Sequence, residues 1–380
     1  MPDTMTAIRK MAPAKGLEVC TIPRPQPGPE DVLVYVEAAS LCGTDLHIWN
    51  WDQWSQRRIK TPLTLGHEFC GTVVAIGDKV RNVCVGDYVS AESHVTCGMC
   101  YQCRTGQAHM CPKTSILGVD REGAFASYVA VPEKVIWQNN RAKLPPEIAT
   151  LQEPFGNAVF STMNQDLSGQ SVVVLGCGPI GLFTIGIAKA VGAKAVFASD
   201  IHPFRINLAK QMGATHVFNP TKPEKPGADI VAEMVEANDG YGVDFVLEMS
   251  GAPTAITSAF RVVRNGGTVI LFGIPSKPVE IDVAENMIFK NLTVLALNGR
   301  RIFDTWYKTR WLLESGVVDL RPLITKTITF DEINDAMAML ARGDACKLVL
   351  LPNAGKPAPI AEPHRTRAPD PNITGAPVHR

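Results

Sequence analysis

Four cysteines in one short segment have the spacing of a metal-binding lobe. Cys97, Cys100, Cys103 and Cys111 stand three, three and eight positions apart. Short loops of this kind let four thiolates turn toward one tetrahedral zinc ion, at about 2.3 Å from the metal. Vicinal disulfides are the alternative, but they are rare in cytosolic chains. We expect a structural zinc here, because four protein ligands leave no position for a substrate.

A second set of residues has the ligand types of a catalytic zinc. Cys42 is followed along the chain by the pair His67-Glu68 and later by Glu153. Thiolate, imidazole and carboxylate groups hold zinc while leaving one position for water or substrate. Neighbours on a regular strand point to opposite faces, so His67 and Glu68 can share one ion only where the backbone is irregular. Either Glu68 or Glu153 can therefore lie outside the first coordination sphere in a given state.

A glycine-rich turn predicts a dinucleotide site. Gly176, Gly178 and Gly181 follow an apolar strand and open a helix. In such a turn the first glycine allows the sharp bend, the second lets the backbone approach a pyrophosphate, and the third permits close helix packing. The N–H groups at the start of the helix are then available to the phosphates.

The residues near the end of the next strand indicate which dinucleotide is bound. Asp200 lies where a carboxylate can accept hydrogen bonds from the adenosine ribose and repel a 2′-phosphate, which favours NAD over NADP. Arg205 could neutralise such a phosphate, but it lies in the following helix, where covering the adenine or pointing into solvent is favoured. The other cofactor contacts that we expect are Ile180, Gly273 and Ile274.

The elements around this turn predict a doubly wound parallel sheet. Short β-branched runs alternate with amphipathic segments, as in βαβ units. The expected strands are 172–175, 195–199, 215–218, 243–248, 268–272 and 292–297. The expected helices are 180–191, 203–212, 230–238, 253–263 and 283–289, with Gly266-Gly267 forming the turn after the fourth helix.

The remainder of the chain has the pattern of a β-rich unit. Strands such as 32–37 and 71–75 lie among many glycines and prolines, and helices at 303–313 and 331–340 and a strand at 347–351 follow the parallel sheet. We expect an α/β protein. Its β-rich catalytic domain spans 1–155 and 298–352, a dinucleotide-binding domain is inserted at 156–297, and 353–380 form a disordered tail.

Composition excludes several functional classes. Hydrophobic residues make up 46% of the chain and charged residues 19%, which suits a folded core rather than disorder. Lys plus Arg and Asp plus Glu both number 37, so no electrostatic footprint for nucleic acid or an anionic membrane is present. No signal peptide or run of roughly 18 apolar residues is evident. We expect a cytoplasmic protein whose ten cysteines serve metal binding or catalysis.

These motifs resemble the zinc-dependent medium-chain alcohol dehydrogenases. The resemblance runs from about Met5 to Leu351 and rests on residues 42–47, 66–68, 97–111, 153–158 and 176–181. It implies a GroES-like catalytic domain, a Rossmann domain that binds NAD, and a homotetramer. It also implies two zinc ions per subunit, one catalytic and one structural.

Four further segments resemble the branch of this family that oxidises L-threonine, namely 48–56, 93–97, 248–253 and 303–308. Phe160 and Asn298 depart from that branch, where His and an aromatic residue are common.

The implied reaction is oxidation of L-threonine to 2-amino-3-oxobutanoate with hydride transfer to NAD. A polyol or other secondary-alcohol dehydrogenase, of the sorbitol or butanediol type, is the alternative. A non-enzymatic NAD- or zinc-binding protein is disfavoured because no ligand is missing.

Hydride loss from a secondary alcohol requires that the developing alkoxide be stabilised, which zinc does as a Lewis acid. The proton must also leave the site. The Thr44 hydroxyl, close in sequence to Cys42, is the first candidate for a relay, and His47 is the outlet, because imidazole exchanges protons near physiological pH. Asp45 can orient His67.

An amino-acid substrate needs partners for its ammonium and its carboxylate. Glu153 can meet the ammonium when it is not on zinc, and His94 or Arg300 can meet the carboxylate. Three tryptophans can wall the pocket or pack at a subunit contact, namely Trp49, Trp51 and Trp54.

Overall fold

The computed structural model describes residues 2–223 and 229–359, and the chain divides into two compact units. Unit 1 comprises Met1–Glu153 and Ile324–Arg380, and unit 2 comprises Pro154–Leu323. An inserted domain was expected. Its start agrees with the expected position to within two residues, but the chain returns to the first unit at 324 rather than 298.

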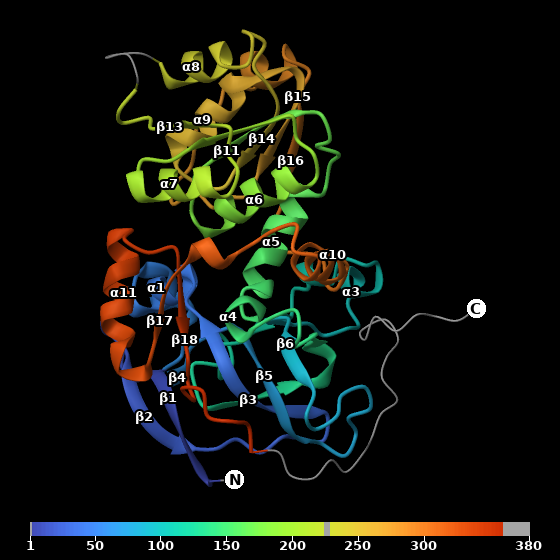
Figure 1. Ribbon diagram of the computed structural model, residues 1–380, viewed down its shortest axis with the longest axis vertical. Coiled ribbons are helices and arrows are strands. Elements are labelled where there is room, and N and C mark those ends of the chain that lie inside the picture. The colour runs from blue at the N-terminus through green and yellow to red at the C-terminus, as the bar shows by residue number, and fades with distance from the viewer. Residues whose placement is uncertain (1, 224–228, 360–380) are drawn as a thin grey trace, which may run out of the picture. The chain divides into compact units, whose positions relative to one another are not determined.

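Unit 2 contains a six-stranded parallel sheet in the order β13-β12-β11-β14-β15-β16, shown in yellow-green to orange in Figure 1. This order is that of a Rossmann domain, with its crevice between β11 and β14. The strands are β11 Ser171–Leu175, β12 Ala195–Ser199, β13 His216–Phe218, β14 Val243–Glu248, β15 Val263–Leu271 and β16 Thr293–Ala296. The helices are α6 Pro179–Ala190, α7 Pro203–Gln211, α8 Ile230–Glu236, α9 Pro253–Val262, the π-helix η3 Ala284–Ile288 and α10 Asp304–Glu314.

The alternation of side chains along β11 places helices on both faces of this sheet. Val173 and Leu175 belong to a buried cluster that also contains residues of α8 and α9. Val174 points the other way, since a Cβ on Gly181 of α6 would lie 3.5 Å from its Cγ1. The predicted strands and helices are confirmed, with one correction. Gly266 and Gly267 lie within β15 and do not form a turn.

The helix after the parallel sheet explains the wrong boundary at 298. Trp306 and Leu312 of α10 are buried. The chain after α10 packs on α6, because a Cβ on Gly186 would lie only 3.3 Å from Cγ1 of Val318. The sequence shows that this helix is amphipathic but not which unit covers its apolar face. Residues 298–323 therefore belong to unit 2.

Unit 1 is β-rich, as expected. Its largest sheet runs β10-β6-β5-β3-β18-β17, with β9 also paired to β3, and a smaller one runs β2-β1-β4. The strands are β1 Thr4–Lys10, β2 Glu18–Pro23, β3 Asp31–Ser40, β4 Leu63–Thr64, β5 Glu68–Ile76, β6 Tyr88–Ala91, β7 His94–Val95, β8 Ser115–Ile116, β9 Tyr128–Pro132, β10 Ile136–Gln138, β17 Ile324–Ile328 and β18 Lys347–Leu350. The helices are α1 Gly43–Asn50, α2 Gln53–Arg58, α3 Tyr101–Arg104, α4 Pro146–Ala149 and α11 Ile333–Arg342, while α5 Gln152–Thr162 crosses into unit 2.

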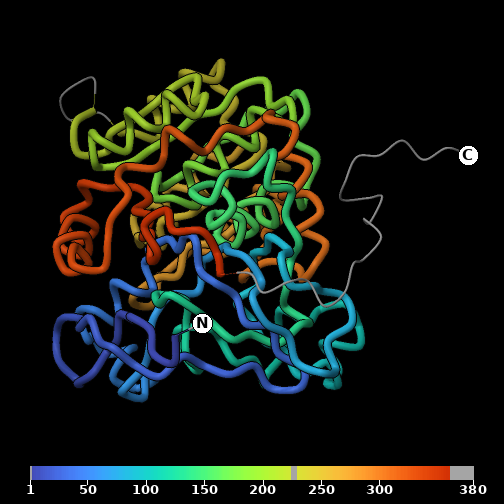
Figure 2. The backbone as a smooth tube through the Cα atoms, turned by 60° about the horizontal axis from the view of Figure 1, so that its bottom comes forward, coloured from blue at the N-terminus to red at the C-terminus, as the bar shows by residue number. Residues whose placement is uncertain are grey.

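The C-terminal part of unit 1 returns to the N-terminal strands, as the red and blue segments of Figure 2 show. Strand β18 pairs antiparallel with β3, with Val349 opposite Ser40. The chain stays ordered beyond it. The Asn353 side chain donates to the carbonyl of Val36 at 2.9 Å, and Tyr35 donates to the carbonyl of Lys356 at 3.2 Å. A disordered tail from 353 is therefore wrong for its first residues, and 360–380 lie outside the described residues.

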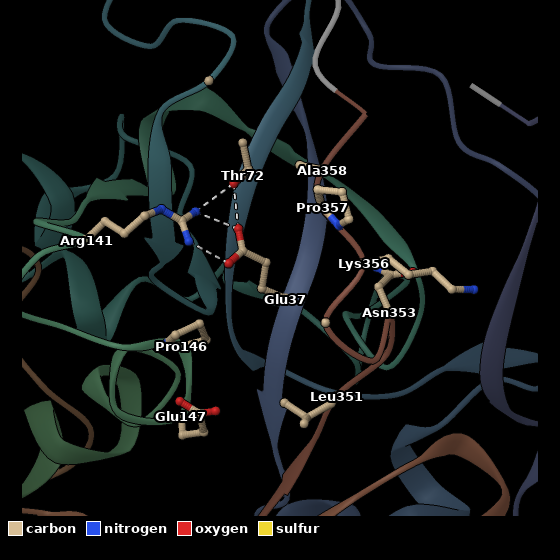
Figure 3. A pocket seen from close by; sticks show the side chains of 12 residues that line it. Glu37, Thr72, Arg141, Pro146, Glu147, Leu351, Asn353, Lys356, Pro357 and Ala358 are labelled. Carbon is tan, nitrogen blue, oxygen red and sulfur yellow. Dashed lines mark hydrogen bonds and ion pairs between the residues drawn. The ribbon is translucent and has the colours of Figure 1, made fainter.

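A polar pocket borders this C-terminal segment (Figure 3). Arg141 donates to Glu37 at 2.8 and 2.6 Å and to the hydroxyl of Thr72 at 2.8 Å. The Thr72 hydroxyl in turn donates to Glu37 at 2.5 Å. Burial alone would raise the pKa of Glu37, but the hydrogen bonds from Arg141 and Thr72 lower it. The pocket is separate from the metal-ligand residues described below. Within the described part of the chain, no helix has the length and apolar content needed to cross a bilayer.

Candidate active site

The four cysteines of the predicted lobe converge in space. All four sulfur atoms lie within 4.8 Å of one another, and the distances Cys100–Cys103 and Cys111–Cys97 are 3.4 and 3.6 Å. Sulfurs of a tetrahedral zinc site lie about 3.8 Å apart, whereas a disulfide requires about 2.05 Å. All ten cysteines are free thiols. The donor set therefore fits one zinc ion and does not form vicinal disulfides.

The sulfur of Cys111 is polarised toward the thiolate. Desolvation raises the pKa of this thiol, but the N–H groups of Cys97 and Lys113 donate to the sulfur, and the net effect lowers the pKa to about 6. Zinc binds the thiolate form of cysteine. Part of the lobe is thus prepared for a metal by its own backbone.

Cys42, His67 and Glu68 form the second predicted cluster, with one ligand atom of each within 4.8 Å of the others. Cys42 caps α1, while His67 directly precedes β5 and Glu68 begins it. Gly66 has φ +93°, and a Cβ there would lie 2.3 Å from the Phe125 ring. The irregular backbone that two adjacent ligands require is therefore present. Glu153 is not in this group, so Glu68 is the carboxylate beside Cys42 and His67 in this structure.

Buried polar atoms without a hydrogen-bond partner lie in and beside this cluster. They are Oδ1 of Asp45, Nδ1 of His67 and Oε1 of Glu68. Burying a polar atom without a partner is costly, so such atoms call for an explanation such as a bound ion. Thiolate, imidazole and carboxylate donors are those of a catalytic zinc, and the residues present fit that ion.

Asp45, which was expected to orient His67, lies near its ring without a hydrogen bond to it. Its Oδ1 is 3.9 Å from Nδ1 of His67, which is longer than a hydrogen bond, and its Oδ2 accepts from the backbone N–H of Cys42 at 2.9 Å. Burial disfavours the charged form of His67, but the negative charges of Cys42 and Asp45 outweigh it and raise the pKa well above its ordinary value. The negative groups around the ring would equally suit a cation bound to the neutral imidazole.

Glu153 belongs to a neighbouring acidic group that includes Glu92, which the sequence did not single out. Ligand atoms of Glu92, His94 and Glu153 lie within 4.8 Å of one another. His94 Nδ1 is 2.9 Å from Glu92, whose oxygen also accepts the backbone N–H of His94, and Ser93 donates to Glu153 at 2.6 Å. The acid two residues before a predicted site histidine was the available signal for Glu92.

The proposed relay residues lie in and beside α1. The Thr44 hydroxyl is 3.8 Å from Sγ of Cys42. The His47 side chain is 62% exposed, and its Nδ1 is 2.5 Å from Asp52. Asp52 also caps α2 by accepting the N–H of Ser55 at 3.0 Å. Thr44 therefore lies next to Cys42, and His47 is open to solvent. Asp52 is a partner of His47 that the sequence does not single out.

The tryptophans do not act as one group. Trp49 is buried in the core of unit 1, and its indole N–H donates to Asn334 at 2.9 Å. Trp51 packs against the same core, whereas the Trp54 side chain is exposed. Neither expected role, a pocket wall or a subunit contact, applies to Trp49. It anchors α1 within unit 1.

The glycine turn has the local geometry that the sequence predicts. Gly176 has φ +96°, and a Cβ on Gly181 would lie 1.9 Å from the carbonyl oxygen of Gly176. Gly178 caps α6 and faces open space. The first glycine thus permits the bend, the third permits close packing, and the second leaves room for a phosphate. Ile180 is half-buried in the first turn of α6.

Asp200 is held at the end of β12 by the backbone. Its oxygens accept the N–H groups of Cys177 and His202, both at 2.8 Å. Arg205 lies against it, with Nη1 3.9 Å from Oδ2. This carboxylate is fixed beside the glycine turn, and Arg205 pairs with it instead of pointing only into solvent.

The remaining predicted residues have two kinds of surroundings. Gly273 follows β15, where a Cβ would lie 2.1 Å from the N–H nitrogen of Gly251, and Ile274 is exposed. Arg300 is buried and donates to Asn157 at 3.1 Å. Gly273 and Ile274 therefore lie at the carboxyl edge of the parallel sheet, whereas Arg300 is hydrogen-bonded to Asn157 within unit 2.

Comparison with known proteins agrees with this geometry. The family model of the alcohol dehydrogenase GroES-like domain matches residues 28–141, and that of zinc-binding dehydrogenases matches 179–315. Proteins named L-threonine 3-dehydrogenase from Symbiobacterium thermophilum and Caldanaerobacter subterraneus are 47% and 45% identical. Each match covers 93% of this chain, and 99% and 100% of those proteins.

A solved structure described as a zinc-binding dehydrogenase from Sinorhizobium meliloti, bound to NADP, has a TM-score of 0.84 and 30% identity. The match covers 92% of this chain and 100% of that one. The identity, coverage and shared fold all lead to one assignment. The chain belongs to the zinc-binding dehydrogenases that carry a GroES-like alcohol dehydrogenase domain.

Proposed function

We propose that this protein oxidises L-threonine to 2-amino-3-oxobutanoate and transfers the hydride to NAD. The observation that carries the proposal is the cluster of Cys42, His67 and Glu68 with its unpartnered buried atoms. Near-full-length similarity to proteins named L-threonine 3-dehydrogenase supports the substrate. A polyol or other secondary-alcohol dehydrogenase remains the second candidate, because the same metal chemistry serves neutral alcohols.

The residues of unit 1 divide the work of the reaction. Cys42, His67 and Glu68 would hold a zinc ion, which supplies Lewis-acid stabilisation of the alkoxide when bound. The Thr44 hydroxyl, 3.8 Å from the Cys42 sulfur, takes part in removing the substrate proton. His47 passes that proton to solvent, and its Nδ1 contact with Asp52 keeps the ring oriented while the other nitrogen exchanges.

The four-cysteine lobe would hold a second zinc ion with a structural role. Its donors are four sulfur atoms within one short segment, so no coordination position is left for a substrate. We therefore propose two zinc ions per subunit. Metal analysis of purified protein tests this count, with two equivalents expected and one equivalent contradicting it.

The acidic group beside the metal cluster favours an amino alcohol over a polyol. Glu92 and Glu153 are buried carboxylates, and His94 of the same group contacts Glu92 at 2.9 Å. A buried carboxylate can make a charge-assisted hydrogen bond to a substrate ammonium, which a neutral polyol cannot provide. We assign the ammonium to Glu153 and the substrate carboxylate to His94.

The fixed carboxylate of Asp200 favours NAD as the dinucleotide. It lies beside the glycine turn and would repel a 2′-phosphate. Arg205, 3.9 Å away, is already paired with it, which lowers its availability to a phosphate. Gly273 and Ile274, at the same sheet edge, would contact the rest of the cofactor.

A steady-state comparison tests the substrate and the cofactor together. The values of kcat/KM are measured for L-threonine, 2,3-butanediol and sorbitol, each with NAD and with NADP. We expect the highest value for L-threonine with NAD, and a product that loses CO₂ on standing because it is a β-keto acid. A higher value for sorbitol or butanediol would replace the proposal with its alternative.

We further propose that the protein is a cytoplasmic homotetramer that serves threonine catabolism. The relatives named L-threonine 3-dehydrogenase support the last part. Light scattering coupled to size-exclusion chromatography tests the assembly, with a mass near four times 41.1 kDa expected. A monomeric mass would contradict it.

A further inference from the structure

A buried lysine contacts the proposed catalytic metal cluster from the end of the chain. Lys347 lies on β18, and its ammonium nitrogen is 2.5 Å from Oε2 of Glu68 and 2.8 Å from the carbonyl oxygen of Leu41. Both side chains of the ion pair are fully buried, with exposed fractions of 1% and 0%. Because Leu41 directly precedes Cys42, one ammonium group contacts both segments that deliver metal ligands.

The two oxygens of Glu68 have different surroundings. Oε2 accepts hydrogen bonds from Lys347 and from the hydroxyl of Ser40. Oε1 is buried and has no partner. A carboxylate that is fixed through one oxygen presents the other in a defined direction, which is how groups behind a metal ligand orient it. The arrangement leaves Oε1 as the oxygen offered to the cluster.

We propose that Lys347 is a positioning residue of the catalytic metal centre: by holding Oε2 of Glu68 it offers only Oε1, and so sets how firmly the ion is bound. This inference rests on the proposed metal centre but not on the identity of the substrate. It gives the last strand of the chain a role in the site beyond closing the sheet through its pairing with β3.

Lys10 provides a matched control for the loss of a buried lysine. It lies in the same unit and is equally buried, but its ammonium donates to the carbonyl oxygens of Ala14, Gly16 and Trp49. Replacing Lys10 thus removes a buried ammonium without altering Glu68. A general effect of such a loss on the fold appears in both variants, whereas an effect on the metal centre is confined to Lys347.

The test measures zinc retention, which does not depend on turnover. Purified zinc-loaded protein is titrated with a chelator whose zinc complex is coloured. The two zinc ions are distinguished by the chelator concentrations at which they are released. We expect Lys347→Met to release the catalytic zinc at a roughly 10- to 100-fold lower chelator concentration. Lys347→Arg should be intermediate, and the lobe zinc should be unaffected in both. Lys10→Met should retain both ions like the wild type.

Cobalt(II) in place of the catalytic zinc gives a second readout, because its visible bands change with the ligand set. We expect altered bands in Lys347→Met and unaltered bands in Lys10→Met. A Glu68→Gln background tests the route of the effect. If Lys347 acts through Glu68, Lys347→Met changes zinc retention much less in that background. If Lys347→Met does not fold, Lys347→Arg and Ser40→Ala must show smaller shifts in the same direction.

Three results would overturn the inference: wild-type zinc retention and cobalt bands in the Lys347 variants, equal zinc loss in Lys10→Met, or an undiminished effect in the Glu68→Gln background. Failure of the proposed function looks different. A wild-type protein that holds this zinc but does not oxidise L-threonine contradicts the substrate and leaves the role of Lys347 intact. A wild-type protein without this zinc contradicts both.

Discussion

The four-cysteine lobe and the cluster of Cys42, His67 and Glu68 are both proposed zinc sites, but they are built in opposite ways. The lobe takes four identical donors from fifteen consecutive positions, 97–111. The cluster takes three different donors from two segments, and it is supported by Asp45 on α1 and Lys347 on β18. The lobe is thus self-contained, whereas the cluster depends on the folded β-rich unit.

This difference reflects the two tasks. A closed set of thiolates favours permanent binding, because every coordination position belongs to the protein. A mixed set with unpartnered oxygen and nitrogen atoms suits an ion that must also accept a substrate. The supporting groups then set the orientation of each ligand. A site that does chemistry needs partners that a purely structural site can omit.

The largest expected effect comes from removing a ligand of the cluster. Cys42→Ser or His67→Ala should lower kcat by about 10³-fold or more, because Lewis-acid stabilisation of the alkoxide is worth several kcal/mol. Thermal unfolding should show that both variants are folded, and metal analysis should show that they retain the lobe zinc. Cys20→Ser, which removes a thiol outside both sites, is the control. Unchanged turnover in the two ligand variants would break the contrast between the sites.

Removing a ligand of the lobe should have the reverse profile. Cys100→Ser should lose the structural zinc and lower Tm by about 5 °C or more, since metal binding there contributes to folding. The kcat of the remaining folded protein should change by less than about threefold. Differential scanning calorimetry and initial rates measure the two effects. A loss of turnover with no loss of thermal stability would assign chemistry to the lobe.

The acidic group beside the cluster predicts a substrate-selective effect. Glu153→Gln should raise the KM for L-threonine by about tenfold, because a charge-assisted contact to the ammonium is replaced by a neutral one. The KM for 2,3-butanediol should stay the same. Initial rates over a range of both substrates measure this effect. Equal increases for both would mean that Glu153 acts on the metal rather than on the ammonium.

The smallest expected effect concerns acid stability away from both metal sites. Hydrogen bonds from Arg141 and Thr72 lower the pKa of Glu37 in the folded state. Their contribution to stability is therefore fully present above the ordinary pKa of about 4.3. It is lost as the pH falls through the lower pKa of the folded state. The difference in free energy of unfolding between wild type and Glu37→Gln should therefore be constant from about pH 7 to 5 and shrink below about pH 4. Denaturant titrations at each pH measure it.

Zinc content measured on the same samples connects this result to the comparison. Glu37→Gln should keep both zinc ions at neutral pH, because the Glu37 and Arg141 pair belongs to the polar pocket and not to either metal site. A stability difference that grows as pH falls would contradict the sign. Loss of zinc in this variant would show that the polar pocket affects zinc binding at the metal sites.

The sequence predicts local patterns well and the partners of distant residues poorly. The parallel strands, the glycine turn and the lobe were predictable because each rests on a short periodicity or spacing. Glu92 lies two residues before the predicted His94 and was still missed. Lys347 and Ser40 contact Glu68 only because β18 and β5 both pair with β3. No local sequence pattern predicts this contact.

The errors have the same physical origin. The boundary at 298 was wrong because the apolar face of α10 can be covered by either unit, and only the fold decides. Trp49 was expected to wall the pocket or to pack at a subunit contact, yet it is buried in the core of unit 1, where Asn334, far along the chain, accepts its indole N–H. Local sequence determines which segments are amphipathic, whereas long-range packing determines which residues their apolar faces and polar groups contact.

Selective removal of the catalytic zinc tests the central claim most directly. A mild chelator should empty the cluster while leaving the lobe loaded, and oxidation of L-threonine should then disappear and return when zinc is added back. Dinucleotide binding, followed by the fluorescence of NADH, should persist throughout. Undiminished oxidation by protein that has lost only the zinc of the cluster would contradict the account.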